Sequence, residues 1–382
     1  MRKLEKITIK GFKSIRDQTL KLDRLNVFIG GNGVGKSNLI GTFRFLHEVI
    51  HQRLAKYAAT RGGADSILHF GRKTTPKMKF QLEFGEAEFS NVYRLEIEGT
   101  ADSGLIVSNE FAYYRDRARP ADRDWIETKT TYRHEPEFRN ELGLDQIAPY
   151  SGESRLLDDR SQHAVQICRD LNGCLAYHFH DTSDTAAMKG IGDLDDNREL
   201  RPQAENLAAF LYYLQEKQPD SFALIEDTIR QIAPFFGGFR LAPSRLNESK
   251  IRLEWRDKGG DGYFNATALS DGTLRFICLA TLFLQPDLPT VIVLDEPELG
   301  LHPAAVTLLA DLMGAASERS QVLVATQSVT LINQLTPEQV WTVNREDDQS
   351  VFRRLGAADL ASWLDDYSLG ELWEKNLIQA RP

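Results

Sequence analysis

The distribution of apolar residues along the chain predicts two kinds of strand. Apolar and polar positions alternate over residues 4–10 and through short segments of residues 78–115, as in strands with one buried face. Two continuous apolar runs, Val291–Leu294 and Val322–Ala325, are typical of strands buried in a parallel sheet. A further predicted strand, Leu25–Ile29, leads directly into a glycine-rich turn. We therefore expect a mixed sheet near the N-terminus and a parallel sheet near the C-terminus.

Apolar residues at helical spacing predict the helices. The segments are residues 38–57, residues 203–236, the stretch that follows Leu269, and residues 303–317. In the second segment Pro219 separates two apolar stripes of about four turns each, which predicts a helical hairpin rather than a long coiled coil. Residues 115–159 are polar and weakly patterned, so loops and short strands are expected there.

The composition of the 382-residue chain is that of an ordinary globular protein, with 42% hydrophobic and 26% charged residues. The 46 basic and 55 acidic residues give a net charge of −9, which excludes a highly basic DNA-coating protein but not a local basic face. Cys168, Cys174 and Cys278 are too few for a disulfide framework. No apolar run approaches the roughly 20 residues that span a bilayer, and the N-terminus is too polar for a secretory signal. We expect a cytoplasmic protein with no membrane partner.

The glycine-rich turn carries the most specific motif of the chain. Residues 30–37 read GGNGVGKS, which satisfies the phosphate-loop pattern G-x-x-x-x-G-K-[ST] between a predicted strand and a predicted helix. Glycines let successive backbone N–H groups point at phosphate oxygens, and the helix N-terminus adds its positive dipole end. Lys36 is expected to reach the β- and γ-phosphates, and Ser37 to ligate Mg²⁺. The expected nucleotide-binding residues are Gly30, Asn32, Gly33, Gly35, Lys36 and Ser37.

Two acidic residues follow the buried run Val291–Leu294. A carboxylate at the C-terminal end of such a strand suits the hydration shell of Mg²⁺, which we assign to Asp295. The next acid, Glu296, points elsewhere and suits the role of a base that takes a proton from an attacking water.

A third segment, Leu269–Arg275, opens a helix 25 residues before Asp295. Ser270 is expected to cap this helix, and a helix N-terminus with Ser270 and Gly272 accepts a phosphate group.

With these motifs in place, the sequence resembles the ATP-binding-cassette type of ATPase head, and within it the soluble SMC/RecF-like branch of AAA-family ATPases. The resemblance covers most of residues 1–85 and 265–335. It rests on the sequence GFKSI at residues 11–15, the phosphate loop, the Leu-Ser-x-Gly signature at 269–272, the acidic strand, the loop Glu298–Pro303 and the segment ATQS at 325–328.

The resemblance implies an α/β fold, an ATPase head with two sheet-containing lobes and a helical insertion. We place an N-terminal lobe at residues 1–160, the insertion at 161–245 and a C-terminal lobe at 246–382. It also implies Lys13 as a nucleotide contact and a dimer with two nucleotides. In that dimer, each ATP lies between the phosphate loop of one copy and the signature of the other.

Two positions depart from the family pattern. The switch position, often histidine, is Gln327, which donates a hydrogen bond but cannot carry a proton, so slow hydrolysis is expected. The family also uses a glutamine that senses Mg²⁺ in the first lobe, and both Gln81 and Gln162 are candidates.

Other signals are weaker. His178 and His180 share one strand face, but no third metal ligand with suitable spacing follows, so a structural or interface role is favoured. Basic residues cluster in three places and form either a phosphate-binding face or a solvated surface. The clusters are Arg2 to Lys21, residues 71–80 with Arg72, Lys73, Lys77 and Lys79, and Arg115, Arg117 and Arg119. About 45 residues follow Pro337, too few for an added nuclease domain.

The favoured function is an ATPase, converting ATP and water to ADP and phosphate with Mg²⁺. Its ATP-dependent homodimer acts on double-stranded DNA or on a separate effector protein, in DNA repair or antiviral defence. An alternative is a regulatory scaffold that turns ATP over slowly and controls a partner nuclease or toxin. The motor subunit of a membrane transporter is disfavoured, because the Ser270–Gly272 signature and the Glu298–Pro303 loop resemble the soluble branch.

Overall fold

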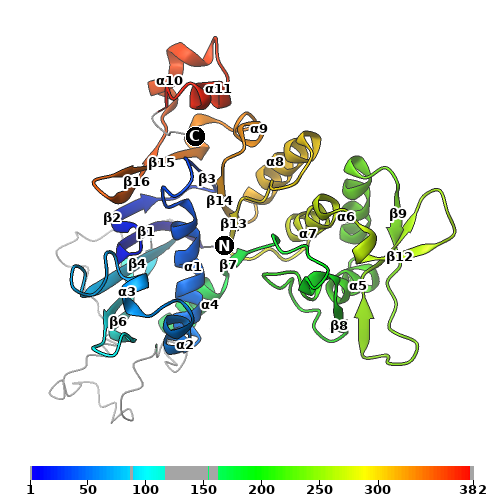
Figure 1. Ribbon diagram of the computed structural model, residues 1–382, viewed down its shortest axis with the longest axis horizontal. Coiled ribbons are helices and arrows are strands. Elements are labelled where there is room, and N and C mark those ends of the chain that lie inside the picture. The colour runs from blue at the N-terminus through cyan, green and yellow to red at the C-terminus, as the bar shows by residue number, and fades with distance from the viewer. Residues whose placement is uncertain (1, 87–88, 117–153, 155–161, 379–382) are drawn as a thin grey trace.

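A computed structural model describes residues 2–86, 89–116, 154 and 162–378. Its two main sheets lie on either side of the first long helix (Figure 1). The antiparallel sheet has the order β2-β1-β4-β5-β6. Its strands are β1 (Lys3–Phe12), β2 (Ile15–Lys21), β4 (Lys77–Glu86), β5 (Phe89–Gly99) and β6 (Leu105–Asp116).

The second main sheet has the order β16-β15-β3-β14-β13-β7, and only its edge strand β16 runs antiparallel to its neighbour. Its strands are β3 (Leu25–Ile29), β7 (Cys174–Tyr177), β13 (Val291–Asp295), β14 (Gln321–Thr326), β15 (Val340–Glu346) and β16 (Gln349–Arg354). Strands from all three predicted segments, 1–160, 161–245 and 246–382, thus meet in this one sheet. The runs at 25–29, 291–294 and 322–325 are confirmed as buried parallel strands.

Two hydrophobic clusters cover the two faces of the six-stranded sheet. On one face, α1 (Lys36–Ile50) and α4 (Gln162–Asn172) pack with the antiparallel sheet. On the other face lie α7 (Asp271–Leu284) and α8 (Pro303–Ser317), followed outward by α5 (Leu207–Lys217) and α6 (Pro219–Ile232). The three cysteines are buried thiols. Within the described ranges, the helices are too short or too polar to cross a membrane.

The part of the chain between β7 and α7 projects from the sheets at the right of Figure 1. The predicted helical hairpin is confirmed there as α5 and α6, with Pro219 in the first turn of α6, where its missing N–H costs nothing. Small strands accompany the hairpin. They are β8 (Ile191–Asp193), β9 (Phe236–Phe239), β10 (Lys250–Arg252), β11 (Glu254–Asp257) and β12 (Tyr263–Asn265).

The remaining elements are short. They are α2 (Leu54–Thr60), α3 (Ala64–Ile67), α9 (Val329–Ile332), α10 (Ala357–Leu364) and α11 (Leu369–Glu374), with single 3₁₀ turns at Ala187–Lys189, Ala266–Ala268 and Pro337–Gln339.

One predicted helix is wrong in its length. The segment 38–57 is not continuous, because α1 ends at Ile50 and α2 begins only at Leu54. Gln52 adopts a left-handed backbone with φ +58°, and Arg53 folds back onto Glu48 through both its backbone N–H and its guanidinium. The weakly patterned residues 117–153 and 155–159 lie outside the described residues.

A single buried side chain ties the two main sheets together. Gln321 at the start of β14 is 3% exposed and accepts a hydrogen bond from Leu4 N at 3.1 Å. Its amide donates to Leu4 O at 3.0 Å and to Asp23 O at 2.7 Å. Asp23 O also accepts from the Asn26 side chain at 2.6 Å, so the particular contribution of Gln321 is the double hydrogen bond with Leu4, which joins β1 to β14.

We expect the Gln321→Leu substitution to lower the free energy of unfolding by about 2–4 kcal/mol, since it leaves buried backbone donors and acceptors unpaired. Chemical denaturation followed by circular dichroism measures this loss. Gln334→Leu, at an exposed position, is the matched control and should change stability little. Equal stabilities of the two variants would contradict the assigned role of Gln321.

Candidate functional site

The phosphate loop joins β3 to α1 at the carboxyl end of the parallel strands. Gly30, Gly33 and Gly35 have φ values of +156°, +77° and +109°, which side-chain-bearing residues rarely adopt. A Cβ atom on Gly35 would lie 2.0 Å from Ser350 Oγ and 2.6 Å from Ser14 Oγ, whereas one on Gly33 would meet no atom within 4 Å. The loop therefore packs on two serines on one side and is open on the other.

Those two serines hold the loop in place through hydrogen bonds. Ser350 Oγ donates to Val34 O at 2.6 Å, and the two hydroxyls lie 2.6 Å apart. Asn38 in the first turn of α1 donates to Ser14 Oγ at 2.7 Å. The GFKSI segment at residues 11–15 therefore contributes a direct support of the phosphate loop.

Lys36 is buried in the centre of this loop. Its ammonium group donates to Gly30 O at 2.5 Å and to Gly31 O at 2.9 Å. Burial lowers the pKa of Lys36, while the carboxylates of Glu296, Asp295 and Glu298 oppose that shift. In this position the ammonium group can bind phosphate oxygens in place of the two loop carbonyls.

Asp295 ends β13, two strands away from the phosphate loop. Burial raises its pKa, and a hydrogen bond from the Ser37 side chain opposes the shift. Its Oδ1 atom is buried and has no hydrogen-bond partner. An orphaned carboxylate oxygen beside a serine hydroxyl is the donor set that Mg²⁺ takes together with waters, so Ser37 and Asp295 fit the predicted magnesium site.

Glu296 follows in a left-handed backbone conformation with φ +43°. Its N–H donates to Ala325 O at 2.7 Å, which holds the turn against β14. Its carboxylate accepts a hydrogen bond of 2.5 Å from the side-chain amide of Gln327, which also donates to Asn32 Oδ1 at 2.9 Å. The structure therefore brings the predicted pair Glu296 and Gln327 together, with the phosphate loop as the third partner.

Glu298 is a site residue that sequence reasoning placed only in an interface loop. It is a buried carboxylate whose Oε1 accepts from the Thr326 hydroxyl and from Gln327 N–H at 3.3 Å. Burial raises the pKa of Glu298. This hydrogen bond holds the backbone of Gln327 in place and so positions its side-chain amide. The signal for it was a further acid two residues after the proposed base.

The signature segment forms the start of α7, as predicted. Ser270 caps the helix by accepting from Thr273 N at 3.2 Å, and both residues are at least partly exposed. Gly272 packs against the loop 298–303 so closely that a Cβ atom would lie 2.4 Å from Gly300 O.

Arg275, one turn further along α7, is buried and donates to backbone carbonyls only: Phe179 O at 3.0 Å, His180 O at 3.1 Å, and Leu299 O. It thereby joins the signature helix to the segment after β7 and to the loop after the acidic strand. Sequence reasoning had no signal for this contact, because a buried arginine in an apolar helix has no local partner.

Lys13 lies in the turn between β1 and β2, half-buried against α1 near Gly41. Burial lowers its pKa, and the guanidinium groups of Arg61 and Arg44 lower it further. Three cations thus gather beside α1, a setting that favours an anion.

Of the two glutamines considered for magnesium, Gln81 lies on the outer face of the antiparallel sheet. Its amide donates to Glu83 Oε1 at 2.6 Å and its oxygen accepts from Arg94 at 2.7 Å. The inward positions of β4 are the apolar ones, so Gln81 faces away from the site. Gln162 begins α4, and its side chain is not among those described.

The two histidines after β7 lie next to the acidic strand. His180 Nε2 donates to Asp295 O at 2.7 Å, and the rings of His178 and His180 have centroids 4.3 Å apart. Burial, with Arg44 nearby, lowers the pKa of His178 to about 4. Among the described residues, no three His, Cys, Asp or Glu side chains gather as a separate metal site.

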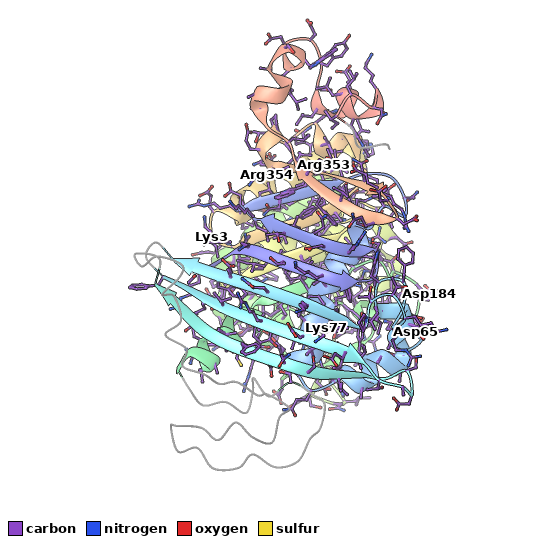
Figure 2. The ribbon with its side chains drawn as sticks, turned by 90° about the vertical axis from the view of Figure 1, so that its left-hand side faces the viewer. Lys3, Asp65, Lys77, Asp184, Arg353 and Arg354 are labelled. Atoms are coloured by element: carbon purple, nitrogen blue, oxygen red, sulfur yellow. The ribbon has the colours of Figure 1, made fainter. Side chains whose placement is uncertain are left out.

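The predicted basic clusters lie largely on the open face of the antiparallel sheet, which Figure 2 shows with Lys3 and Lys77 labelled. Acids from neighbouring strands pair with many of these lysines. The pairs are Lys6–Glu83 and Lys10–Asp17 at 2.8 Å, Lys77–Glu98 at 2.9 Å, and Lys79–Glu96 at 2.7 Å. The stretch 71–80 holds no acid in sequence, but three of its four basic residues have an acidic partner in space, because Arg72 also pairs with Asp65 at 2.8 Å. Arg117 and Arg119 lie outside the described residues.

Comparisons with solved structures identify the fold. An SMC head bound to the C-winged helix domain of ScpA matches with a TM-score of 0.59 and 15% identity, over 94% of this chain and 99% of that one. Two more heads, from Pyrococcus furiosus and Pyrococcus yayanosii, match with TM-scores of 0.53 and 0.51 and identities of 15% and 14%. Each of these matches covers 96% of this chain and 99% of the other. At such identities the likeness shows the fold alone.

Comparison with family descriptions identifies the chain more closely. No curated protein matches the sequence. The family described as "AAA domain, putative AbiEii toxin, Type IV TA system" matches residues 25–333, from β3 to α9. That span includes the phosphate loop, the signature and the acidic strand. The chain therefore belongs to this AAA family, with the α/β fold of an SMC/RecF-like ABC-type ATPase head.

Proposed function

We propose that this protein is an ATP-binding and ATP-hydrolysing switch that forms a homodimer when ATP is bound. One observation carries the proposal. The amide of Gln327 spans from Asn32 of the phosphate loop to Glu296 of the acidic strand, so the three segments that ATP chemistry needs share one side chain. The exposed Ser270 at the start of α7 supplies the surface that a second copy would present to the nucleotide.

Each residue has a task that follows from its surroundings. The backbone N–H groups of the phosphate loop and the ammonium of Lys36 bind the phosphates, and Lys13 adds positive charge beside α1. Ser37 and Asp295 hold Mg²⁺, which neutralises charge that develops on the transferred phosphoryl group. Glu296 accepts a proton from the attacking water, provided that Gln327 first releases its carboxylate.

That last condition supports the second candidate function. The Glu296 oxygen that accepts from Gln327 at 2.5 Å becomes available for a proton only when that hydrogen bond breaks, and such a step would slow hydrolysis. A slow ATPase suits a regulatory scaffold that controls a partner nuclease or toxin. Stimulation of turnover by double-stranded DNA supports the switch acting on DNA, whereas unchanged turnover supports the scaffold.

A protein partner is better supported than DNA. On the open sheet face Lys6, Lys77 and Lys79 are paired with acids, so these lysines are less available to replace the counterions of a DNA backbone. The SMC heads with the same fold were solved with ScpA domains, and the family description names a toxin. A setting in DNA repair or antiviral defence remains part of the proposal and rests on the resemblance.

The first test concerns nucleotide binding. Gly35→Ala should abolish it, because the new methyl group meets the two serine hydroxyls and the φ of +109° is strained for alanine. Titration with a fluorescent ATP analogue measures the affinity. Gly314→Ala in α8, where a Cβ atom would meet no atom within 4 Å, is the control and should bind as the unaltered protein does. Retained binding in Gly35→Ala would contradict the assignment of the loop.

The second test concerns the base and the dimer. Glu296→Gln should reduce ATP turnover by roughly 100-fold or more while ATP still binds. Light scattering during size-exclusion chromatography should then show a dimer with ATP and a monomer without it. Lys36→Ala, which removes the phosphate ligand, should stay monomeric in both conditions. A Glu296→Gln protein that stays monomeric in ATP would remove the dimer from the proposal.

The third test asks whether each site is shared between two copies. Lys36→Ala and Ser270→Arg should each be inactive alone. Since neither variant forms an ATP-bound dimer with itself, the dimers in an equal mixture contain one copy of each, and one of their two sites has an intact loop and an intact signature. Turnover should recover to at most about half of the unaltered level. No recovery would show that the phosphate loop and the signature do not act across an interface.

A further inference from the structure

The strongest unexplained feature lies between β7 and β13. These strands pair in parallel with Tyr177 opposite Leu294, so the next residues, His178 and Asp295, stand side by side. Leu294 and Tyr177 both belong to the hydrophobic cluster on the α7 side of the sheet. Side chains alternate along a strand, so the residues that follow them lie on the other side. His178 and Asp295 therefore share the face that α1 covers.

Two further contacts fix this neighbourhood. His180 Nε2 donates to Asp295 O at 2.7 Å, which holds the end of β7 against the end of β13. The Arg44 guanidinium from α1 lies within electrostatic range of both Asp295 and His178, which the strand register places side by side.

Each of these three side chains has an unsatisfied atom. His178 Nδ1, Asp295 Oδ1 and an Arg44 NH2 group are buried and have no hydrogen-bond partner. Buried polar atoms in folded proteins are nearly always paired, so the orphaned atoms of the neighbouring residues His178 and Asp295 indicate a missing polar occupant. Two of the three are acceptors if the His178 ring is neutral with its proton on Nε2. Two acceptors cannot satisfy one another, and they call for an occupant that donates.

A hydrated magnesium ion is such an occupant. Mg²⁺ in nucleotide sites keeps several waters, whose hydrogens are strong donors because the ion polarises them. We propose that His178 Nδ1 accepts a hydrogen bond from a water of the magnesium shell held by Ser37 and Asp295. His178 is then a positioning residue for the ion, in the role for which Gln81 and Gln162 had been considered. This inference rests on the proposed Mg²⁺ and ATP site.

The pair of histidines in α1 provides a matched control. His47 and His51 have ring centroids 4.2 Å apart, and the pKa of His47 is also lowered to about 4, chiefly by burial. They lie in the last turns of α1 and around its C-cap, at the far end of the helix from the phosphate loop. A substitution at His47 therefore reproduces the loss of a partly buried ring without touching the volume beside Asp295.

The test measures binding rather than turnover. A fluorescent, non-hydrolysable ATP analogue is titrated into the full-length protein at a series of Mg²⁺ concentrations and in EDTA. His178→Leu should raise the half-saturating Mg²⁺ concentration by about 10-fold or more, the usual effect of removing an outer partner of a metal site. Affinity in EDTA should stay unchanged. His178→Asn, whose Oδ1 lies near the position of Nδ1, should restore most of the Mg²⁺ dependence, and His47→Leu should leave it unaltered.

The outcomes separate the two levels of the argument. An unaltered half-saturating Mg²⁺ concentration in His178→Leu would overturn the role of His178 alone. Absence of Mg²⁺-dependent nucleotide binding in the unaltered protein would overturn the proposed function and this inference with it. If His178→Leu does not fold, as judged by thermal melting, the comparison of His178→Asn with His178→Ala replaces it. In that comparison, only the alanine variant should show weakened Mg²⁺ dependence, and equal behaviour of the two would overturn the inference.

Discussion

Parallel pairing of β3, β14 and β13 is the constraint on which the rest of the site depends. Parallel strands end at the same edge of a sheet, so the loops that follow these three strands must meet there. The register aligns Ile29 with Thr326 and Ala325 with Asp295. Asn32 and Gln327, 295 residues apart in sequence, consequently lie within 2.9 Å of one another. The GFKSI turn and β16 then contact the phosphate loop through Ser14 and Ser350.

The parts of this site that are local in sequence could be predicted. A phosphate loop needs glycines, lysine and serine at fixed spacing between a strand and a helix, so residues 30–37 could be recognised from the sequence. Asp295 could be recognised because it follows a fully apolar strand. The parallel strands were also readable, because burial on both faces leaves a continuous apolar run. The break in the helix after Ile50 was not, since it depends on Arg53 folding back onto Glu48.

The supporting residues could not be predicted, because their partners are distant in sequence. Arg275 reaches the carbonyls of Phe179 and His180, and Gln321 reaches Leu4 and Asp23. A side chain that forms hydrogen bonds with distant backbone groups leaves no sequence motif, because every residue offers a backbone carbonyl. The face of Gln81 was readable, however, because the apolar positions of β4 alternate with it and mark the buried side. Acids that neutralise the lysines at 77 and 79 come from β5, which a linear count of charge does not reveal.

The charges of the site favour joint binding of the proposed nucleotide and metal. Asp295, Glu296 and Glu298 lie close enough for each to act on Lys36, and burial raises the pKa of both Asp295 and Glu298. A triphosphate would add several negative charges to this group, with one lysine in the loop to offset them. A divalent cation held by Asp295 and Ser37 would offset this repulsion. Gln327 is a neutral hydrogen-bond donor and adds no charge to this group. An amide at Gln327 holds Asn32 and a carboxylate at once through two N–H groups, whereas a neutral histidine has only one ring N–H to donate. Glutamine at this position therefore stabilises the nucleotide-free arrangement more than a neutral histidine would. In the proposed reaction, the hydrogen bond from Gln327 would have to break before the same Glu296 oxygen could accept a proton.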